Sequence, residues 1–562
     1  MLLPGFISQR VAAVAQRAGD ALIFAKLVRS AGIGRIARLR LAPGFLPLAL
    51  KARGGPHLAI MWHARSQPQA LAVAGDRRAL TYAALDVEAN QLAHAMIGRG
   101  IQPGDRIALL LPNSVEHVVA QQAIARLGGS AVQLGYRLTA PEIAYIFENA
   151  QPAGLITHAE GTTLAAEAMA IAGQDLGTHA VVTNQPAHAA PSLGTRYEDA
   201  LAEHPGDKPP VGADARRGGL IVYTSGTTGR PKGASRSLRQ TGLEAFAEMA
   251  LRVGMRHDDR HLVVCPLYHS GAVAFANLML ALGASLHVRE QFDAEAFLAD
   301  ITKHQISSAF VVPTMLVRLL ELPEATRARY DTSSLRWVMS GAAPLAPETA
   351  ARFQAAFGPV LWNFYGATET GLVTLAGPDD HVARPGTVGR RLRGNELRIL
   401  DEAGKPVAPG EVGELYVRNA MLIAGYHRDE GATRSAMRDG FFSVGDLARI
   451  DEDGYLYLAS RTHDMVISGG VNIYPREIED RLHEHPAVAE AAVVGLPDAE
   501  WGEVVTAFVV PRAGAALEAE EIRGFCRETL AGFKGPRRVE IVNDLPRSPT
   551  GKVLKRQLVA ES

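Results

Sequence analysis

Residues 106–134 read RIALLLPNSVEHVVAQQAIARLGGSAVQL, and their pattern indicates the fold class. The apolar run at 106–111 predicts a strand, and Asn113 with Glu116 three residues later predicts a helix N-cap with its capping-box partner. Apolar residues then recur at helical spacing, which predicts a helix over 114–127, and the run AVQL resumes as a strand. Strand, helix and strand in this order are typical of an α/β fold with largely parallel sheets.

Outward from this stretch, short apolar runs bounded by turn residues continue the alternation, at 154–157, 179–183, 219–223, 262–266 and 308–312. From about residue 385 the pattern changes to strand-sized pieces separated by turns, at 397–400, 413–417 and 454–458. This change predicts a β-rich subdomain, after which the last hundred residues return to mixed α/β.

Charged and polar residues at 460–464 separate two apolar strands and predict a domain boundary. We therefore expect a basic N-terminal extension at 1–55 and a large domain at 56–461, built of α/β subdomains plus the β-rich one. A small, mobile α+β domain is expected at 462–562.

The composition sets limits on function. The chain has 562 residues, of which 47% are hydrophobic and 21% charged, so disorder and fibrous repeats are excluded and several domains fit. The net charge of −1 argues against nucleic acid as a partner. Only Cys265 and Cys526 occur, which excludes a disulfide framework and a cysteine-based metal site, and fits a cytoplasmic protein.

Two features bear on membranes. Residues 1–55 carry nine basic side chains and one acidic one, a net charge of +8. Two readings stay open for them: a basic arm that contacts the inner face of a membrane peripherally, or a helical extension packed on the body.

Residues 261–288 lack Asp, Glu, Lys and Arg, but Pro266, His269 and Asn277 interrupt the apolar run. A buried strand, loop and core helix are therefore expected instead of a membrane span. The protein is expected to be soluble.

A glycine- and hydroxyl-rich loop follows one predicted strand, where residues 223–233 read YTSGTTGRPKG. Glycines permit positive φ and close backbone approach, so that N–H groups can point at an anion. Pro231 precedes Lys232 and Gly233 follows it, so this is not a Walker loop. The loop is predicted to grip phosphate through Thr224, Ser225, Gly226, Thr227, Thr228, Gly229 and Lys232.

This string closely resembles the phosphate-binding signature of the adenylate-forming (AMP-binding) superfamily, which includes acyl-CoA synthetases, peptide-synthetase adenylation domains and beetle luciferases. Further motifs follow in the family's order along nearly the whole chain. Residues 340–345 read SGAAPL, similar to the adenine-binding turn, and residues 363–370 read NFYGATET, which matches the adenine-stacking and metal motif. The resemblance implies nucleotide contacts from Gly341, Ala342, Ala343, Asn363, Tyr365, Gly366 and Thr368.

Within these motifs the residue chemistry fits the implied roles. Tyr365 offers a flat face for a purine, and Thr368 can donate to an α-phosphate. Glu369 is a hard oxygen ligand suited to Mg²⁺ that bridges nucleotide phosphates.

Two later motifs add charged groups. In residues 441–461, FFSVGDLARIDEDGYLYLASR, the resemblance implies that Asp446 binds the ribose hydroxyls and that Arg461 lies near them. The family's usual Thr-Gly-Asp and Gly-Arg are here Val-Gly-Asp and Ser-Arg, which keeps both charges. Residues 546–556 read PRSPTGKVLKR, and Lys552 matches the family's C-terminal catalytic lysine. The implied catalytic set is Lys552, Thr224, Lys232 and Glu369.

Residues 461–479, RTHDMVISGGVNIYPREIE, resemble the family's domain hinge and the glycine loop beyond it. Gly469 and Gly470 are implied to line the pantetheine tunnel of CoA. His463 stands where relatives usually have Asp or Lys. Because free imidazole titrates near pH 6.5, a hinge that responds to pH between 6 and 8 is one reading, and a tolerant polar spacer is the other.

The acyl pocket is implied at 266–278, 310–313 and Gly341, with a lining of His269, Gly271, Ala272, Val312 and Gly341. No Asp or Glu occurs between residues 266 and 282 to pair an α-ammonium, so an amino-acid substrate is disfavoured. Small side chains leave room for an alkyl chain. A medium- or long-chain fatty acid is favoured, with an aryl or other hydrophobic acid as the alternative. His269 is read either as a gate or as a satisfied core histidine.

The expected activity is that of an ATP-dependent acyl-CoA synthetase that works through an acyl-adenylate. Lys232, Lys552 and Mg²⁺ at Glu369 would supply positive charge where two anions react. The alternatives are an adenylating enzyme that loads a carrier protein, and a non-enzymatic binding relative. The expected partners are the acid, ATP and CoA, with a homodimer left open.

Overall fold

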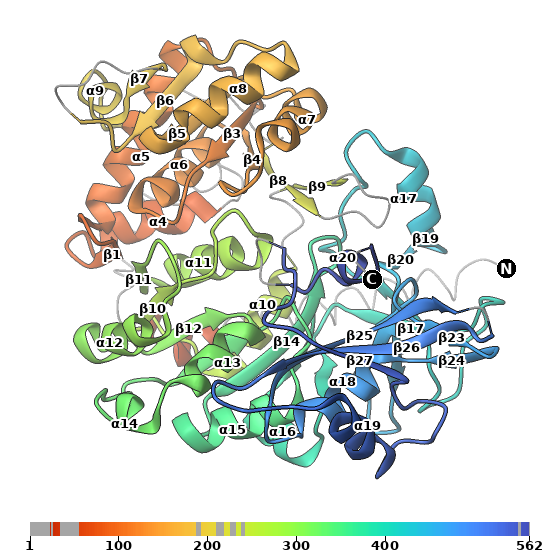
Figure 1. Ribbon diagram of the computed structural model, residues 1–562. Helices are drawn as coiled ribbons and strands as arrows, with labels where there is room; N and C mark the ends of the chain where they lie inside the picture. Colours follow the sequence, from red (N-terminus) through yellow and green to blue (C-terminus); the bar gives the residue numbers. More distant parts are fainter. Residues whose placement is uncertain are drawn as a thin grey trace, which may run out of the picture. The chain divides into compact units, whose positions relative to one another are not determined.

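The computed structural model describes residues 23, 26–33, 56–186, 193–209, 218–224, 232–237, 242–498, 500–548 and 552–560 (Figure 1). By its internal contacts the chain divides into two units. The first unit comprises residues 1–290, 392–394 and 419–430, and the second comprises residues 291–391, 395–418 and 431–562.

The first unit contains a sheet with the strand order β7–β6–β5–β3–β4–β8–β9, in which all neighbours run parallel except the antiparallel pair β8 and β9. β3 is buried along nearly its whole length, as expected for a strand with both faces covered. The strands are β3 (Arg106–Leu110), β4 (Ser130–Gln133), β5 (Gly154–His158), β6 (Ala180–Thr183), β7 (Thr195–Arg196), β8 (Gly219–Thr224) and β9 (Lys232–Ser237). The helices of this part are α5 (Tyr82–Gly98), α6 (Val115–Arg126), α7 (Ala140–Ala150), α8 (Thr162–Ala172) and α9 (Tyr197–Ala202).

A second group of strands in this unit has the order β2–β1–β11–β10, with β1, β11 and β10 parallel and β2 antiparallel to β1. The uncharged stretch 261–288 forms a strand, a loop, a helix and a second strand here, as predicted. The elements are α4 (Pro56–Ser66), β1 (Leu71–Ala74), β2 (Ala79–Thr81), α10 (Leu243–Val253), β10 (Arg260–Val263), α11 (Ser270–Leu282) and β11 (Ser285–Val288).

The second unit begins with three parallel strands, β12–β13–β14, and continues through antiparallel strands in the order β15–β16–β22–β21–β18–β20–β19, with β17 paired to β18. The antiparallel part is the predicted β-rich subdomain. Its strands are β12 (Ser308–Val311), β13 (Trp337–Ser340), β14 (Leu361–Ala367), β15 (Gly371–Ala376), β16 (Thr387–Arg391), β17 (Glu396–Leu400), β18 (Gly413–Arg418), β19 (Met437–Arg438), β20 (Phe441–Phe442), β21 (Asp446–Ile450) and β22 (Tyr455–Arg461). The helices are α12 (Ala294–His304), α13 (Pro313–Glu321), α14 (Glu324–Arg327), α15 (Pro347–Phe357), α16 (Pro378–Ala383) and α17 (Glu430–Ala436).

The C-terminal part of the second unit has its own sheet, β24–β23–β26–β25, with β27 parallel to β26. Ile478, Leu482 and Ile522 from two helices pack on its apolar face and form a separate core. The elements are β23 (Val466–Ser468), β24 (Val471–Ile473), α18 (Pro475–His483), β25 (Val488–Asp498), β26 (Gly502–Pro511), α19 (Ala519–Arg527), β27 (Arg538–Ile541) and α20 (Lys555–Ala560). A large α/β domain followed by a small C-terminal one is the predicted fold class.

One local prediction is wrong. The N-cap of α6 is Ser114, whose side chain accepts a first-turn N–H at 3.1 Å, and not Asn113. Asn113 is buried, and its amide binds the segments that follow β10 and β11. Its Oδ1 accepts from the N–H of Leu267 at 2.7 Å, while Nδ2 donates to the carbonyls of Cys265 at 3.0 Å and Arg289 at 3.2 Å. The Asn113 side chain therefore forms hydrogen bonds with backbone groups that are distant in sequence, and it does not cap the helix as the local pattern predicts.

Part of the N-terminal extension is packed on the first unit. Within residues 26–33, Leu27 and Ala31 are buried, and the carbonyl of Ala31 accepts a hydrogen bond from the N–H of His257 at 3.0 Å. For this stretch the structure therefore supports the packed extension. The remainder of 1–55, apart from residue 23, lies outside the described residues.

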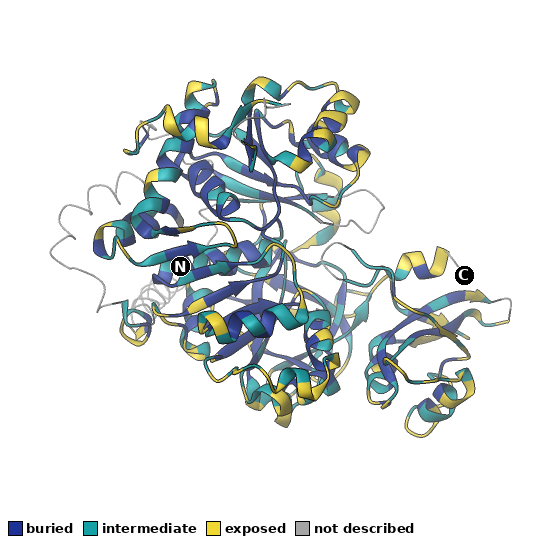
Figure 2. Cartoon of the chain, turned by 60° about the vertical axis from the view of Figure 1, so that its left-hand side comes forward, coloured by how far each residue is buried: buried dark blue, intermediate teal, exposed yellow. Residues whose placement is uncertain are grey.

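Figure 2 shows that buried residues concentrate in the strands and on the inner sides of the helices. None of the helices that the structure describes is both long and apolar enough to cross a bilayer.

Candidate active site

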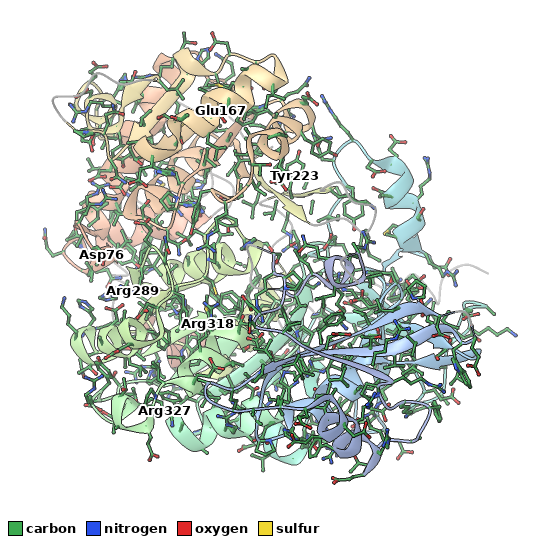
Figure 3. The ribbon with its side chains drawn as sticks, in the orientation of Figure 1. Asp76, Glu167, Tyr223, Arg289, Arg318 and Arg327 are labelled. Carbon is green, nitrogen blue, oxygen red and sulfur yellow. The ribbon has the colours of Figure 1, made fainter. Side chains whose placement is uncertain are left out.

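The β8–β9 hairpin of the first unit carries the two ends of the predicted phosphate loop. Thr224 and Lys232 lie opposite each other in its register, so the backbone brings both ends of the loop together. Beside them, the hydroxyl of Tyr223 (labelled in Figure 3) donates to Oδ1 of Asn149 at 2.6 Å and ties the hairpin to α7. The loop residues between these ends lie outside the described residues; they include Ser225, Gly226, Thr227, Thr228 and Gly229.

Lys232 has a neighbour that sequence reasoning missed. Its ammonium lies over the ring of Tyr426, 5.1 Å from the ring centroid. Tyr426 also forms an antiparallel bridge with Ala234 on β9. No local pattern links a tyrosine to a lysine so much earlier in the chain, so only the fold could reveal this pair.

In the second unit, predicted residues gather at the carboxyl ends of parallel strands. Val311 at the end of β12 pairs with Ser340 of β13, which pairs with Asn363 of β14, so the turns that follow β12 and β13 emerge at one edge. Val312 follows β12, and Gly341, Ala342 and Ala343 follow β13. This edge is where open α/β sheets bind ligands.

The close packing at this edge explains why a glycine stands at residue 341. A Cβ added to Gly341 would lie 2.4 Å from a ring carbon of Phe364, so a side chain there would displace the ring. Asn363 is buried, and its Oδ1 has no hydrogen-bond partner among the described residues.

Tyr365, Asp446 and Arg461 form a polar group. The Tyr365 hydroxyl donates to Oδ2 of Asp446 at 2.6 Å, and Nε of Arg461 lies 3.2 Å from Oδ1 of the same carboxylate. Asp446 and Arg461 are paired across β21 and β22, so the sheet register sets this contact. Burial, reinforced by the Asp446 carboxylate, raises the pKa of Tyr365, which keeps the phenol protonated as a donor. The structure thus brings together three residues that the motifs assigned to the nucleotide.

The turn between β14 and β15 presents Thr368 and Glu369. A Cβ on Gly366 would lie 2.0 Å from the carbonyl oxygen of Gly371, so the turn can close only with glycine. The Glu369 side chain is buried, with 7% of the residue exposed. One such carboxylate fits Mg²⁺, which usually takes one or two carboxylates and completes its shell with phosphate oxygens and water.

The described residues offer few further protein ligands for a Mg²⁺ coordination shell at Glu369. In the part of the chain that the structure describes, no group of three or more His, Cys, Asp or Glu side chains could hold a metal ion.

Lys552 lies within electrostatic reach of these carboxylates. Burial lowers the pKa of its ammonium from 10.5 to about 8; Arg461 acts in the same direction, and Asp446 and Glu369 oppose it. The chain doubles back around this lysine, since the Ser548 N–H donates to the Lys552 carbonyl at 2.8 Å. The C-terminal motif and the two nucleotide motifs therefore converge.

The surroundings of His463 disfavour its charged form. Burial lowers its pKa, and the cations of Arg461, Arg556 and Lys552 lower it further, while Asp464, whose Oδ1 lies 3.5 Å from Nε2, opposes them. The titration expected between pH 6 and 8 is therefore displaced to lower pH, because burial and three cations disfavour the imidazolium.

Gly469 and Gly470 form the tip of the β23–β24 hairpin. Both have positive φ, at +58° and +77°. A Cβ on Gly469 would lie 2.9 Å from the ring of Trp501, whereas one on Gly470 would meet nothing within 4 Å. Sequence reasoning missed the Trp501 contact, because the tryptophan comes from the separate β25–β26 connection.

The residues implied for the acyl pocket in the first unit begin α11. His269 is the N-cap, and Gly271 and Ala272 lie in the first turn. The His269 ring lies 4.3 Å from that of Tyr268, between centroids. Burial lowers the pKa of His269 to about 4, so the ring is neutral at pH 7. Nε2 of His269 and the Tyr268 hydroxyl are buried without partners among the described residues, which argues against the satisfied core histidine.

A family profile described as "AMP-binding enzyme" matches residues 60–427, and one described as "AMP-binding enzyme C-terminal domain" matches residues 477–552. The chain belongs to the AMP-binding enzyme family. The superfamily that the motifs implied is thereby confirmed.

Its relatives include acyl-CoA ligases over nearly their whole length. A feruloyl-CoA synthase of an Amycolatopsis species is 36% identical over 88% of this chain and 96% of its own. The long-chain-fatty-acid–CoA ligase FadD13 of Mycobacterium tuberculosis is 34% identical over 85% and 92%. The structure of o-succinylbenzoate CoA synthetase from Bacillus subtilis, in complex with an acyl-adenylate intermediate, matches with a TM-score of 0.75 at 28% identity, over 89% and 97% of the two chains. This AMP-binding enzyme therefore falls in the CoA-ligase branch.

Proposed function

We propose that this AMP-binding enzyme is an ATP-dependent ligase that converts a hydrophobic carboxylic acid to its CoA thioester through an acyl-adenylate. The observation that carries the proposal is the convergence of Lys552 with Asp446 and Glu369. A solvated lysine has a pKa near 10.5, whereas the pKa of Lys552 is lowered to about 8, mainly by burial. Such a perturbed group beside the residues of a nucleotide motif is typical of a catalytic site.

In the first half-reaction a carboxylate oxygen attacks the α-phosphorus of ATP, and pyrophosphate leaves with the electron pair of the broken P–O bond. Two anions must approach each other, so the site has to supply positive charge and orientation. Lys552 and Lys232 supply charge, and Thr224 and Thr368 supply hydroxyl donors. Mg²⁺ bound at Glu369 would neutralise part of the phosphate charge.

The nucleoside is held by the remaining residues of the set. Asp446 keeps lone pairs for the ribose hydroxyls beside its bonds to Tyr365 and Arg461. The flat ring of Tyr365 offers a face to the adenine. The turn at Gly341, Ala342 and Ala343, the backbone at Gly366, and Asn363 would border the base.

In the second half-reaction the thiol of CoA attacks the acyl carbon and AMP leaves, so no enzyme nucleophile is required. Gly469 and Gly470 would line the path of the pantetheine arm. The open space around a Cβ at Gly470 fits a surface along which a ligand passes.

For the acid, we propose a medium- or long-chain fatty acid. The uncharged α11 start with its small side chains supports an alkyl chain, and so does the similarity to FadD13. A second candidate is an aryl acid, supported by the similarity to feruloyl-CoA synthase and by the rings of Tyr268 and His269. Their buried, unpartnered polar atoms would suit a substrate hydroxyl.

Pyrophosphate release with a panel of fatty and aryl acids, measured with and without CoA, tests the proposal. A CoA ligase forms the thioester and turns over only with CoA. A carrier-protein ligase releases about one equivalent of pyrophosphate and then stalls, whatever the CoA concentration. The absence of release with every acid would contradict an enzymatic function.

We also propose that the basic residues of 1–55 bring the enzyme to an anionic membrane surface. The support is their net charge of +8 in a chain whose total net charge is −1.

A further inference from the structure

Residues 419–430, called the strap below, cross the first unit although the chain on either side belongs to the second. Met421 is buried beside Gly242, where an added Cβ would lie 2.3 Å from its Cγ. At the other end, Arg428 donates to Oε1 of Gln151 at 2.6 Å. The strap is therefore anchored at both ends to the unit that carries the predicted phosphate loop.

Between these anchors the strap runs along the strand that leaves the loop. Tyr426 forms an antiparallel bridge with Ala234, and the His427 N–H donates to the carbonyl of Gly233 at 2.7 Å. These partners are the two residues directly after Lys232. The backbone of Tyr426 is thus fixed relative to Lys232 by main-chain hydrogen bonds and does not depend on a flexible tether.

This backbone placement brings the Tyr426 ring next to the Lys232 ammonium. The Lys232 ammonium lies 5.1 Å from the ring centroid, within the range of a cation–π contact. A lysine has four rotatable bonds, and holding it in one orientation carries an entropic cost that ATP binding would otherwise bear. A ring face attracts the ammonium electrostatically and, unlike a carboxylate, carries no net charge that would compete with phosphate.

We propose that Tyr426 is a positioning residue that holds the Lys232 ammonium ready for the phosphates of ATP. This inference rests on the proposed function, in which Lys232 binds those phosphates. In this role Tyr426 acts on ATP through Lys232, whose ammonium its ring faces.

Calorimetric measurement of ATP binding tests whether the Tyr426 ring contributes to ATP affinity. Tyr426→Leu should weaken ATP binding about three- to thirtyfold, the span of cation–π contacts, and Tyr426→Phe should stay within about twofold of wild type because the ring is kept. The affinity for adenosine, which has no phosphates, should not change in either variant. Tyr330→Leu is a matched control: it removes a ring that lies 5.8 Å from Arg329, and ATP affinity should be unaffected.

A double-mutant cycle separates positioning from a general structural role. In a Lys232→Met background, Tyr426→Leu should cause no further loss of ATP affinity, since its effect passes through the lysine. If Tyr426→Leu does not fold, pentafluorophenylalanine at residue 426 keeps the shape but reverses the charge of the ring face, and the same loss is expected.

The inference is overturned if the Phe variant is as weak as the Leu variant, or if the loss persists without Lys232. The proposed function fails separately: a wild-type protein that binds ATP but releases no pyrophosphate with any acid is not the proposed ligase. The coupling between Tyr426 and Lys232, measured by binding, would still stand.

Discussion

Among single residues, Lys552 is the one whose charge the proposed chemistry uses most directly. Lys552→Ala should slow adenylate formation by about 10²-fold or more, because a charge that meets the transition state in a desolvated site is lost. Thioester formation from supplied acyl-AMP should be largely unchanged, since that step releases AMP. Single-turnover measurements of each half-reaction check this.

A control for this variant lies in the same domain. Lys534 pairs with Glu477 at 2.8 Å on the surface, so Lys534→Ala should leave both half-reactions near wild type. Equal losses in the two half-reactions of Lys552→Ala would refute the separate roles.

The pH dependence of adenylation should also reflect the deprotonation of the Lys552 ammonium. Its pKa of about 8 means that the required ammonium is present below pH 8 and is lost as the pH rises through that value. In kcat/KM for ATP, which reflects the free enzyme, we expect a limb that falls by about tenfold per pH unit above pH 8.

Lys552→Arg should lack this limb, because a guanidinium stays protonated throughout the range. The overall rate of this variant is expected to be lower, since the geometry of the two cations differs. A wild-type profile that stays flat from pH 7 to 10 would contradict the assignment.

Among the elements, the β23–β24 hairpin offers the clearest test. Gly470→Leu should slow thioester formation while adenylate formation continues, because the new side chain would obstruct the pantetheine path. The assay measures pyrophosphate release and CoA consumption in parallel. Comparable loss of both would show that the hairpin does not line the path.

Backbone strain must be separated from obstruction in this experiment. Gly470 has φ +77°, where a leucine costs about 1–2 kcal/mol. Gly454 has φ +83° and, like Gly470, nothing within 4 Å of an added Cβ. Gly454→Leu in the β21–β22 turn therefore carries a similar strain, and both half-reactions should survive it.

At the level of the whole molecule, the N-terminal extension is proposed to bind a membrane surface, whereas the rest of the chain is proposed to carry out the reaction. Basic residues near an anionic surface contribute about 1 kcal/mol each, so partial engagement would give reversible binding. We expect the full chain to co-sediment with phosphatidylserine vesicles at low salt and to dissociate as ionic strength rises. Binding that is indifferent to salt or to lipid charge would rule out this mechanism.

The variant for this test should remove basic side chains of the extension and keep its packing contacts with the first unit. Deletion of 1–55 would strip the contacts of Leu27 and Ala31, which are buried on the first unit, and we expect it to destabilise the protein. Substitution of basic residues by glutamine at Arg35, Arg38 and Arg40 avoids those contacts. This variant should lose vesicle binding and keep its activity on a short, soluble acid.

The fold class and most of the elements follow from local patterns in the amino-acid sequence. Apolar runs such as 106–111 and 154–157 became β3 and β5 within a residue or so, because burial of a parallel strand on both faces leaves a strong local signature. The motifs also select Tyr365, Asp446, Arg461 and Lys552. The structure places the first three in contact and Lys552 within electrostatic reach of Asp446 and Arg461. These signals are local or depend on short, specific strings.

The partners of these side chains, in contrast, depend on the tertiary fold. Asn113 has the residue type of a helix cap, yet three backbone groups that are distant in sequence bind its amide. His463 has an ordinary imidazole, but burial beside three cations lowers its pKa. Tyr426 reaches Lys232 because the strap pairs with β9. Hydrogen bonding, desolvation and cation–π attraction depend on distances in space, and a sequence pattern records only separation along the chain.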